Sequence, residues 1–204
     1  TEANDIVLAE EQPEPPSVGG EYTGTVRYVT DGDTIRLENP VLGSDRVRFV
    51  NIDTPEINMG SGNGAHGDNQ DEHGEAAKAY LESLLQPGDE VTLIIGDETT
   101  DDYGRLLAEV VNKDGINTNL EMVKQGYAVT YFLWPYGADS VFEEYQHAVK
   151  EAIDNELGIW NPDNPLIELP FEYRAILEGG DFDKFVGNYD TKEYVEPLDF
   201  KQVP

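Results

Sequence analysis

The stretch TGTVRYVTDGDTIRLENPVLGSDRVRFVNIDTPE, residues 23–56, decides the fold. Its runs of β-branched and aromatic residues predict three short strands, at residues 23–29, 34–37 and 46–52. The Asp31-Gly32-Asp33 sequence predicts a turn between the first two strands, because glycine accepts backbone angles that other residues avoid. The three strands are therefore short and closely spaced in the chain.

The remaining chain mixes helical and strand periodicity. Apolar residues at helical spacing predict a helix from Ala76 to Leu85, which stops at Pro87-Gly88. The stretch Asn58–Glu72 is rich in Gly, Asn and Asp and predicts a loop. Further strands are predicted at 91–95 and 105–111, and further helices near 120–126 and at 141–153. Five strands and three helices predict a mainly β fold with α elements, a five-stranded β-barrel with three helices packed on it.

Composition divides the chain into three parts. Residues 1–20 carry acids and prolines but no basic residue, so we interpret them as an acidic, Pro-rich leader or linker. Residues 21–160 contain the predicted elements and form the folded domain. Residues 161–204 show no clear period but keep several aromatic side chains, so we expect a C-terminal extension that wraps the domain. Because the first residue is Thr, we expect a processed product or a module of a larger chain.

Charge gives a first indication about partners. The chain has 204 residues, with 13 Lys plus Arg against 42 Asp plus Glu and a formal net charge of -29. A field this negative repels nucleic acid and anionic lipid, so charge alone favours a small-molecule, cationic or protein partner. The apolar content of 38% is low but sufficient for a core.

Cysteine and long apolar runs are absent from the sequence. Without Cys, neither a disulfide nor a thiolate metal site can form. No apolar run approaches the roughly 18 residues that a membrane span needs. The chain also starts without the charged and then apolar pattern of a signal segment. We therefore expect no membrane span.

Two aspartates at strand ends form a candidate metal site. Asp33 opens one predicted strand and Asp53 closes another, so pairing of neighbouring strands can bring their carboxylates together. Two close carboxylates repel each other unless a cation lies between them. Ligation by oxygen alone favours Ca²⁺ or Mg²⁺ over Zn²⁺. His66 and His73 lie in or beside the predicted loop, and we expect exposed side chains there rather than metal ligands.

A carboxylate and two arginines complete the candidate chemistry. Glu56 follows Asp53 by three residues, beyond a proline, which is a suitable place for a base that activates water. Arginine is scarce in this chain, so Arg48 and Arg105 are informative. A guanidinium beside a metal and a carboxylate base suits phosphoryl transfer, because it neutralises charge that develops on phosphate oxygens. Each feature alone is ordinary, and their order and spacing together favour a site.

The combined pattern resembles the staphylococcal nuclease family, also called thermonucleases. The match runs from about Tyr22 to Trp160 through DGDT, RFVNIDTPE, DDYGRLLA, VKQGYA and ELGIW. The resemblance implies an OB-fold barrel with three helices, similar to the architecture predicted above. It also implies hydrolysis of DNA and RNA with Ca²⁺, by cleavage of the 5′ P–O bond to leave 3′-phosphate ends.

The resemblance assigns roles around the metal. Asp33 and Asp53 look like the direct carboxylate ligands of Ca²⁺, and Thr54 looks like a ligand through its backbone carbonyl. Asp31 resembles the family's more distant acid, which is linked to the metal by water. Glu56 matches the carboxylate that activates the attacking water.

The resemblance also assigns roles around the substrate. Arg48 and Arg105 match the two arginines that clamp the scissile phosphate. Tyr103 and Leu107 match residues that line the nucleotide pocket, and Tyr131 looks like an aromatic that packs near the base or phosphate.

Two functions follow from this pattern. One is a Ca²⁺-dependent, sugar-nonspecific nuclease, and the alternative is a catalytically idle OB-fold module that binds nucleic acid or protein. An idle module usually lacks a metal acid, the base or an arginine. All of these are present, which favours the enzyme: Asp33, Asp53, Glu56, Arg48 and Arg105.

The resemblance changes the meaning of the acidic composition. The acids concentrate in the leader, the loop and the tail, while a bound cation turns the acids of the site into a phosphate receptor. We therefore expect weak nonspecific adhesion of the protein to nucleic acid. Substrate binding is then expected to depend on the metal and a few arginines. We also expect a monomeric, exported bacterial protein, extracellular or cell-wall associated, since a very acidic surface keeps such a protein soluble.

Overall fold

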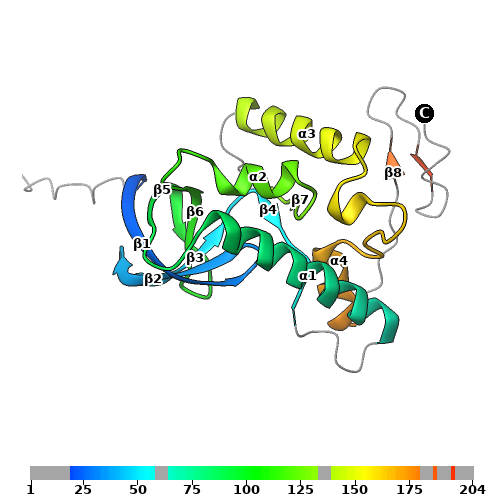
Figure 1. Cartoon of the computed structure of the whole chain (residues 1–204), viewed down its shortest axis with the longest axis horizontal. Coiled ribbons are helices and arrows are strands. Elements are labelled where there is room, and N and C mark those ends of the chain that lie inside the picture. Colours follow the sequence, from blue (N-terminus) through cyan, green and yellow to red (C-terminus); the bar gives the residue numbers. More distant parts are fainter. Residues whose placement is uncertain (1–18, 58–63, 133–138, 180–185, 188–193, 196–204) are drawn as a thin grey trace, which may run out of the picture.

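A closed five-stranded barrel forms the centre of the molecule (Figure 1). The structure, a computed structural model, describes residues 19–57, 64–132, 139–179, 186–187 and 194–195. The strand order is β1-β2-β3-β6-β5; β3 and β6 pair in parallel and the other neighbours are antiparallel. The strands are β1 (Gly20–Asp31), β2 (Thr34–Val41), β3 (Ser44–Phe49), β5 (Glu90–Thr100) and β6 (Leu106–Val111). The predicted mainly β barrel with packed helices is confirmed.

The third predicted strand is interrupted in the structure. β3 ends at Phe49, and β4 (Ile52–Asp53) begins after Asn51, whose φ of 67° lies in the left-handed region. Asn is one of the few residue types that adopt this region readily, so the chain can turn out of the barrel here. β4 then pairs with β7 (Val129–Thr130). Asp53 is therefore held outside the barrel ladder, in a small sheet of its own.

The helices lie to one side of the barrel (Figure 1). They are α1 (Gly64–Leu84), α2 (Thr118–Lys124), α3 (Asp139–Asp154) and α4 (Pro170–Leu177), with a 3₁₀ turn at Gly158–Trp160. Within the described residues, no helix is long and apolar enough to cross a membrane. The final described segments, β8 (Val186–Gly187) and β9 (Tyr194–Val195), form an antiparallel pair.

The loop predicted for residues 58–72 is wrong from Gly64 onward, because α1 begins there. Residues 58–63 lie outside the described part of the chain. The first half of α1 lacks an apolar stripe and buries Gly67, Gln70 and His73 instead. The expectation that His73 is exposed is therefore wrong, whereas His66 is exposed as expected.

The barrel interior and the covering helices share one apolar core. Its residues come from alternate positions of the strands and from one face of each of α1, α2 and α3. Burying an aliphatic or aromatic side chain of this kind contributes about 1.5–3 kcal/mol. Representative fully buried members are Val26, Ile35, Leu37, Phe49, Leu81, Leu93, Leu106 and Met122.

The segment after Trp160 is ordered by contacts with the first half of α1. Asn69 Oδ1 accepts a hydrogen bond from Ile167 N at 3.0 Å, and Gln70 Nε2 donates to Glu168 O at 2.7 Å. The sequence showed no period here, yet α4 follows directly and Tyr173 on it is buried. This segment brings a further side chain to the site described below. The rest of the predicted extension, beyond Gly179, lies almost entirely outside the described residues.

Candidate active site

The turn between β1 and β2 lies tightly against two other parts of the chain. A Cβ on Gly32 would lie 2.8 Å from the Ala77 Cβ and 2.8 Å from the Thr54 Oγ1. Only glycine allows this approach, since Cβ contacts under about 3 Å do not occur without a shift. Asp33 N donates to Asp31 Oδ1 at 3.1 Å, which fixes the turn. The turn thereby places Asp33 next to the end of β4.

Asp33 and Asp53 are buried together although they come from different strands. Asp33 Oδ2 accepts hydrogen bonds from Thr54 N at 2.9 Å and Thr54 Oγ1 at 3.0 Å. The Asp53 side chain is only 1% exposed. Thr54, the residue after Asp53, thus fixes the Asp33 carboxylate to the end of β4 through its backbone and its hydroxyl.

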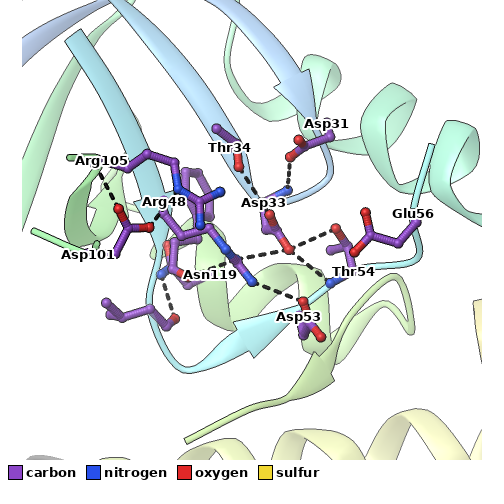
Figure 2. Close-up of polar contacts among 12 residues, drawn as sticks. Asp31, Asp33, Thr34, Arg48, Asp53, Thr54, Glu56, Asp101, Arg105 and Asn119 are labelled. Atoms are coloured by element: carbon purple, nitrogen blue, oxygen red, sulfur yellow. Dashed lines mark hydrogen bonds and ion pairs between the residues drawn. The ribbon is translucent and has the colours of Figure 1, made fainter. Parts of the chain in front are cut away.

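Arg48 bridges the two aspartates. Its Nη1 lies 2.9 Å from Asp33 Oδ2, and its Nη2 lies 2.9 Å from Asp53 Oδ1. Figure 2 shows the guanidinium pointing from β3 toward both carboxylates. Its side chain is 13% exposed, so these are charge-assisted bonds in a largely dry environment. One positive charge therefore serves two buried negative charges.

The acidic cluster retains excess negative charge. Burial and, after it, repulsion from Asp33 together raise the pKa of Asp31 to about 7. Burial also raises the pKa of Asp53, while hydrogen bonds and charge from Arg174 and Arg48 oppose the rise. Both shifts mean that the ionised carboxylates are poorly solvated, a condition that a further cation relieves.

A second arginine reaches the cluster from the C-terminal segment. Arg174 on α4 places Nη2 2.7 Å from Asp53 Oδ2 and Nη1 3.1 Å from Asp53 Oδ1. The same Nη1 also bonds to Glu56 Oε1. Arg174 is thus the side chain that joins Glu56 to the aspartate pair.

Glu56 is positioned by α1 as well. Its backbone N donates to the buried Gln70 Oε1 at 3.2 Å. A Cβ on Gly74 would lie 2.7 Å from the Glu56 carbonyl oxygen and 2.8 Å from the Pro55 carbonyl oxygen. The helix therefore packs directly on the backbone that carries Glu56, and the side chain remains half-buried at the edge of the cluster.

Arg105 is held by a partner of its own. Its Nε donates to Asp101 Oδ2 at 2.7 Å and its backbone N donates to Asp101 Oδ1 at 2.9 Å. Figure 2 shows this pair on the side of Arg48 away from Glu56. Arg48 and Leu107 are register partners in the parallel β3–β6 pair, so Arg105 lies two residues before a direct neighbour of Arg48. Arg105 therefore directly precedes β6, the strand that pairs with the Arg48 strand.

The aromatic side chains assigned to the nucleotide pocket lie in different settings. Tyr103 is 74% exposed, and the Arg105 guanidinium lies 5.5 Å from its ring centroid. Tyr131 follows β7, donates its backbone N to Asn51 O at 2.9 Å, and stacks on Phe171 of α4 at 5.5 Å. The Tyr103 side chain is therefore accessible to a ligand, whereas the Tyr131 ring packs on the C-terminal segment.

The donor chemistry of the cluster fits a hard divalent cation. Asp33 and Asp53 supply buried carboxylate oxygens. Thr54 follows Asp53 and hydrogen-bonds to Asp33, so its carbonyl is a further candidate oxygen ligand. Oxygen ligands of this kind suit Ca²⁺ or Mg²⁺. In the described part of the chain, no three or more His, Cys, Asp or Glu side chains group as ligands of one ion. Two carboxylates with backbone and water oxygens are consistent with that finding, since Ca²⁺ and Mg²⁺ accept both.

Three residues that position the site were missed by sequence reasoning. Gln70 lies in the stretch predicted as a loop, and Arg174 lies in the stretch without a period. Asn119 is buried, donates to Val50 O at 3.0 Å and Ala108 O at 3.1 Å, and so supports the bend before β4. The available signal for Arg174 was its rarity, since it is the only arginine after Arg105.

Comparisons with known proteins show which proteins this chain is similar to. The chain matches the family described as staphylococcal nuclease homologue over residues 46–162. It is 47% identical over 199 residues to the protein named endonuclease YhcR from Bacillus subtilis (strain 168), which covers 98% of this chain and 16% of that protein. It is 31% identical over 151 residues to an uncharacterized endonuclease of Escherichia coli O157:H7, covering 74% of this chain and 85% of the relative.

A third relative comes from an archaeon. The uncharacterized protein MJ1439 of Methanocaldococcus jannaschii is 33% identical over 163 residues, covering 70% of this chain and 73% of the relative. The chain therefore spans only 16% of the length of the Bacillus subtilis protein but most of the length of the two smaller relatives. The family match over residues 46–162 includes the strands and turns that carry Arg48, Asp53, Glu56 and Arg105.

Proposed function

The chain belongs to the staphylococcal nuclease family, and we propose that it is a nuclease that hydrolyses phosphodiester bonds of DNA and RNA. The observation that carries this proposal is the buried Asp33–Arg48–Asp53 arrangement with Glu56 at its edge. The Bacillus subtilis and Escherichia coli relatives described above are named endonucleases, which supports the same reaction class. The proposed products are 3′-phosphate ends from cleavage of the 5′ P–O bond.

Ca²⁺ is the proposed cofactor, held by Asp33, Asp53 and the Thr54 carbonyl, with Asp31 acting through water. When bound, it would supply positive charge to a non-bridging oxygen of the scissile phosphate. The burial that raises the pKa of Asp31 and Asp53 supports this proposal, because it makes a cation at the cluster favourable.

The remaining steps belong to side chains of the chain itself. Glu56 accepts the proton of a water that attacks the phosphorus in line with the leaving oxygen. Arg48 and Arg105 donate hydrogen bonds to the phosphate oxygens as negative charge accumulates on them. The ion pair with Asp101 holds the Arg105 guanidinium in place before substrate binds, which reduces the entropy lost in the transition state.

Substrate contacts outside the reacting centre are proposed for Tyr103, Leu107 and Tyr131. Tyr103 is exposed and presents an aromatic face on which a base can stack. A net charge of -29 makes nonspecific binding weak, so the arginines and the cation supply most of the affinity. We further propose that the protein acts outside the bacterial cell, where a very acidic surface keeps it soluble.

A cleavage assay tests the proposed function. The chain is incubated with single-stranded DNA, duplex DNA and RNA at several salt concentrations, with Ca²⁺ or with EGTA. We expect cleavage of all three with Ca²⁺, loss of cleavage in EGTA, and 3′-phosphate ends on the products. Cleavage that persists undiminished in EGTA would refute the metal assignment, and no cleavage under any condition would favour the idle binding module instead.

A further inference from the structure

Both carboxylate oxygens of Asp53 are bonded to guanidinium groups. Oδ1 accepts from Arg48 Nη2 at 2.9 Å and from Arg174 Nη1 at 3.1 Å, and Oδ2 accepts from Arg174 Nη2 at 2.7 Å. Arg174 therefore holds Asp53 in the bidentate geometry that guanidinium and carboxylate favour. Its further bond to Glu56 places one guanidinium between a proposed metal ligand and the proposed base.

Arg174 supplies a counter-charge that the buried Asp53 carboxylate needs. The Asp53 side chain is 1% exposed, and a buried carboxylate without a counter-charge is strongly unfavourable. Arg48 is already shared with Asp33, so it does not neutralise the cluster alone. Arg174 supplies the missing positive charge from the side of the cluster that solvent reaches, since its side chain is 34% exposed.

A divalent cation and Arg174 compete for the same oxygens. Ca²⁺ binds carboxylate oxygens at about 2.3–2.6 Å. A cation at Asp53 Oδ2 would meet the Arg174 guanidinium, whose Nη2 is 2.7 Å from that oxygen. Two positive groups on one oxygen repel each other strongly in a partly dry site. Arg174 must therefore leave Asp53 when a cation binds there.

We propose that Arg174 is a built-in counter-cation, which neutralises Asp53 in the cation-free protein and gives this carboxylate up to the bound metal while it stays on Glu56. This inference rests on the metal site assigned under the proposed function. It makes the C-terminal segment a part of the site, with Arg174 as a positioning residue that sets how readily the metal binds.

The backbone of α4 allows this exchange without undocking. Tyr173 is buried beside Arg174, and Glu172 Oε2 accepts a hydrogen bond from Leu169 N at 2.8 Å at the start of the helix. Phe171 stacks on Tyr131. The helix is thus anchored by Phe171 and Tyr173, while the long, 34% exposed Arg174 side chain can change rotamer. Release of Asp53 then requires a side-chain movement alone.

Direct measurement of Ca²⁺ binding by calorimetry tests this inference without relying on activity. The 204-residue chain is compared with Arg174→Gln, Arg174→Lys and the control Arg36→Gln. Arg36 is matched in exposure, 33% against 34%, and pairs with Asp45 away from the cluster. Because a charge-assisted hydrogen bond to Asp53 is lost, we expect Arg174→Gln to bind Ca²⁺ about tenfold more tightly. Arg174→Lys should lie between, and Arg36→Gln should bind as the parent does.

Thermal unfolding provides a second readout. Without Ca²⁺, Arg174→Gln should melt at a lower temperature than the parent, because Asp53 loses a counter-charge. With saturating Ca²⁺ the difference should shrink, since the cation replaces the arginine at Asp53. Circular dichroism confirms that the variant folds before either comparison is made.

The outcomes separate this inference from the proposed function. If folded Arg174→Gln binds Ca²⁺ with unchanged or lower affinity, while Asp53→Asn abolishes binding, Arg174 is not a competitor of the metal and the inference is wrong on its own. If Asp53→Asn binds Ca²⁺ as tightly as the parent, the metal site itself is misassigned and both proposals fail. Tighter binding by Arg174→Gln, together with loss in Asp53→Asn, supports both.

Discussion

Gly74 of α1 lies directly against the backbone of Glu56. A Cβ at this position would come within 2.7 Å of the Glu56 carbonyl oxygen, a distance that no real Cβ contact shows. Helix α1 can approach the backbone of Pro55 and Glu56, which follows β4, only because residue 74 has no side chain. This contact ties the position of the proposed base to the helix that also receives the C-terminal segment.

Replacing Gly74 by Ala should therefore damage both packing and activity. Alanine normally stabilises a helix by about 1 kcal/mol relative to glycine, but the clash is with backbone and cannot be relieved by a rotamer change. Overpacking of this kind costs about 1–3 kcal/mol, so we expect a net loss of stability. Denaturant unfolding measures it. Gly96→Ala is the matched control, because a Cβ there meets no atom within 4 Å.

Replacing Glu56 by Gln should lower turnover on the order of 10² or more, as removal of a single proton-accepting or charge-stabilising group commonly does. The amide keeps the shape of the side chain but cannot accept the proton of water at neutral pH. Steady-state cleavage of DNA gives kcat and KM separately, and the loss should appear in kcat. Exposed Glu98→Gln serves as the control. A near-normal kcat in Glu56→Gln would remove Glu56 from its proposed role.

Replacing Arg105 by Gly should also lower turnover on the order of 10² or more, because one donor to the phosphate oxygens is lost. The variant Asp101→Asn tests the same guanidinium indirectly, since Asp101 holds its Nε at 2.7 Å. We expect a smaller loss there than in Arg105→Gly, because the arginine remains but is less well oriented. Equal losses in both variants would contradict a direct role for Arg105. Arg36→Gly is the control for removing an arginine from the surface.

The barrel and the aspartate pair were predictable because local rules determine them. The turn at Gly32 and the strands beside it follow from short-range chemistry, and the β2–β3 register then places Thr34, next to Asp33, opposite Arg48, which bonds both aspartates. The bend at Asn51 was not predicted, since it depends on a left-handed residue supported by the distant Asn119. The sequence of residues 46–52, which predicts one continuous strand, does not show that Asn119 will bond to the bend.

The C-terminal half of the site was not predictable from periodicity. The first half of α1 has little apolar character, and polar contacts with residues 164–168 hold it. Each of the two segments looks unstructured alone because its partner lies about a hundred positions away in the chain. Arg174 meets Glu56 across a still larger separation of 118 positions. Long-range polar pairing leaves no local pattern, so only the structure shows it.

We expect the packing of α1 against the segment around residues 164–168 to depend on pH through His73. It is a buried residue of α1, and burial lowers its pKa, while the charge of Glu72 and the backbone of Asn164 and Pro165 partly oppose the shift. The unfolded chain therefore binds a proton at His73 more readily than the native protein. By linkage, the neutral His73 makes its full contribution to the free energy of unfolding above about pH 6.5, the usual pKa of histidine. This contribution is lost as the pH falls from there toward the lower pKa of His73 in the native protein.

Replacing His73 by Gln should remove this dependence. We expect the melting temperature of the parent to fall more steeply between about pH 7 and 5.5 than that of His73→Gln. The difference between the two proteins isolates His73, because all other titrating groups, Asp31 included, are common to both. His147→Gln, which alters an exposed histidine, should follow the parent. Parallel pH profiles for the parent and His73→Gln would show that protonation of His73 does not oppose folding. The packing of α1 against Asn164 and Pro165 would then not depend on the charge of His73.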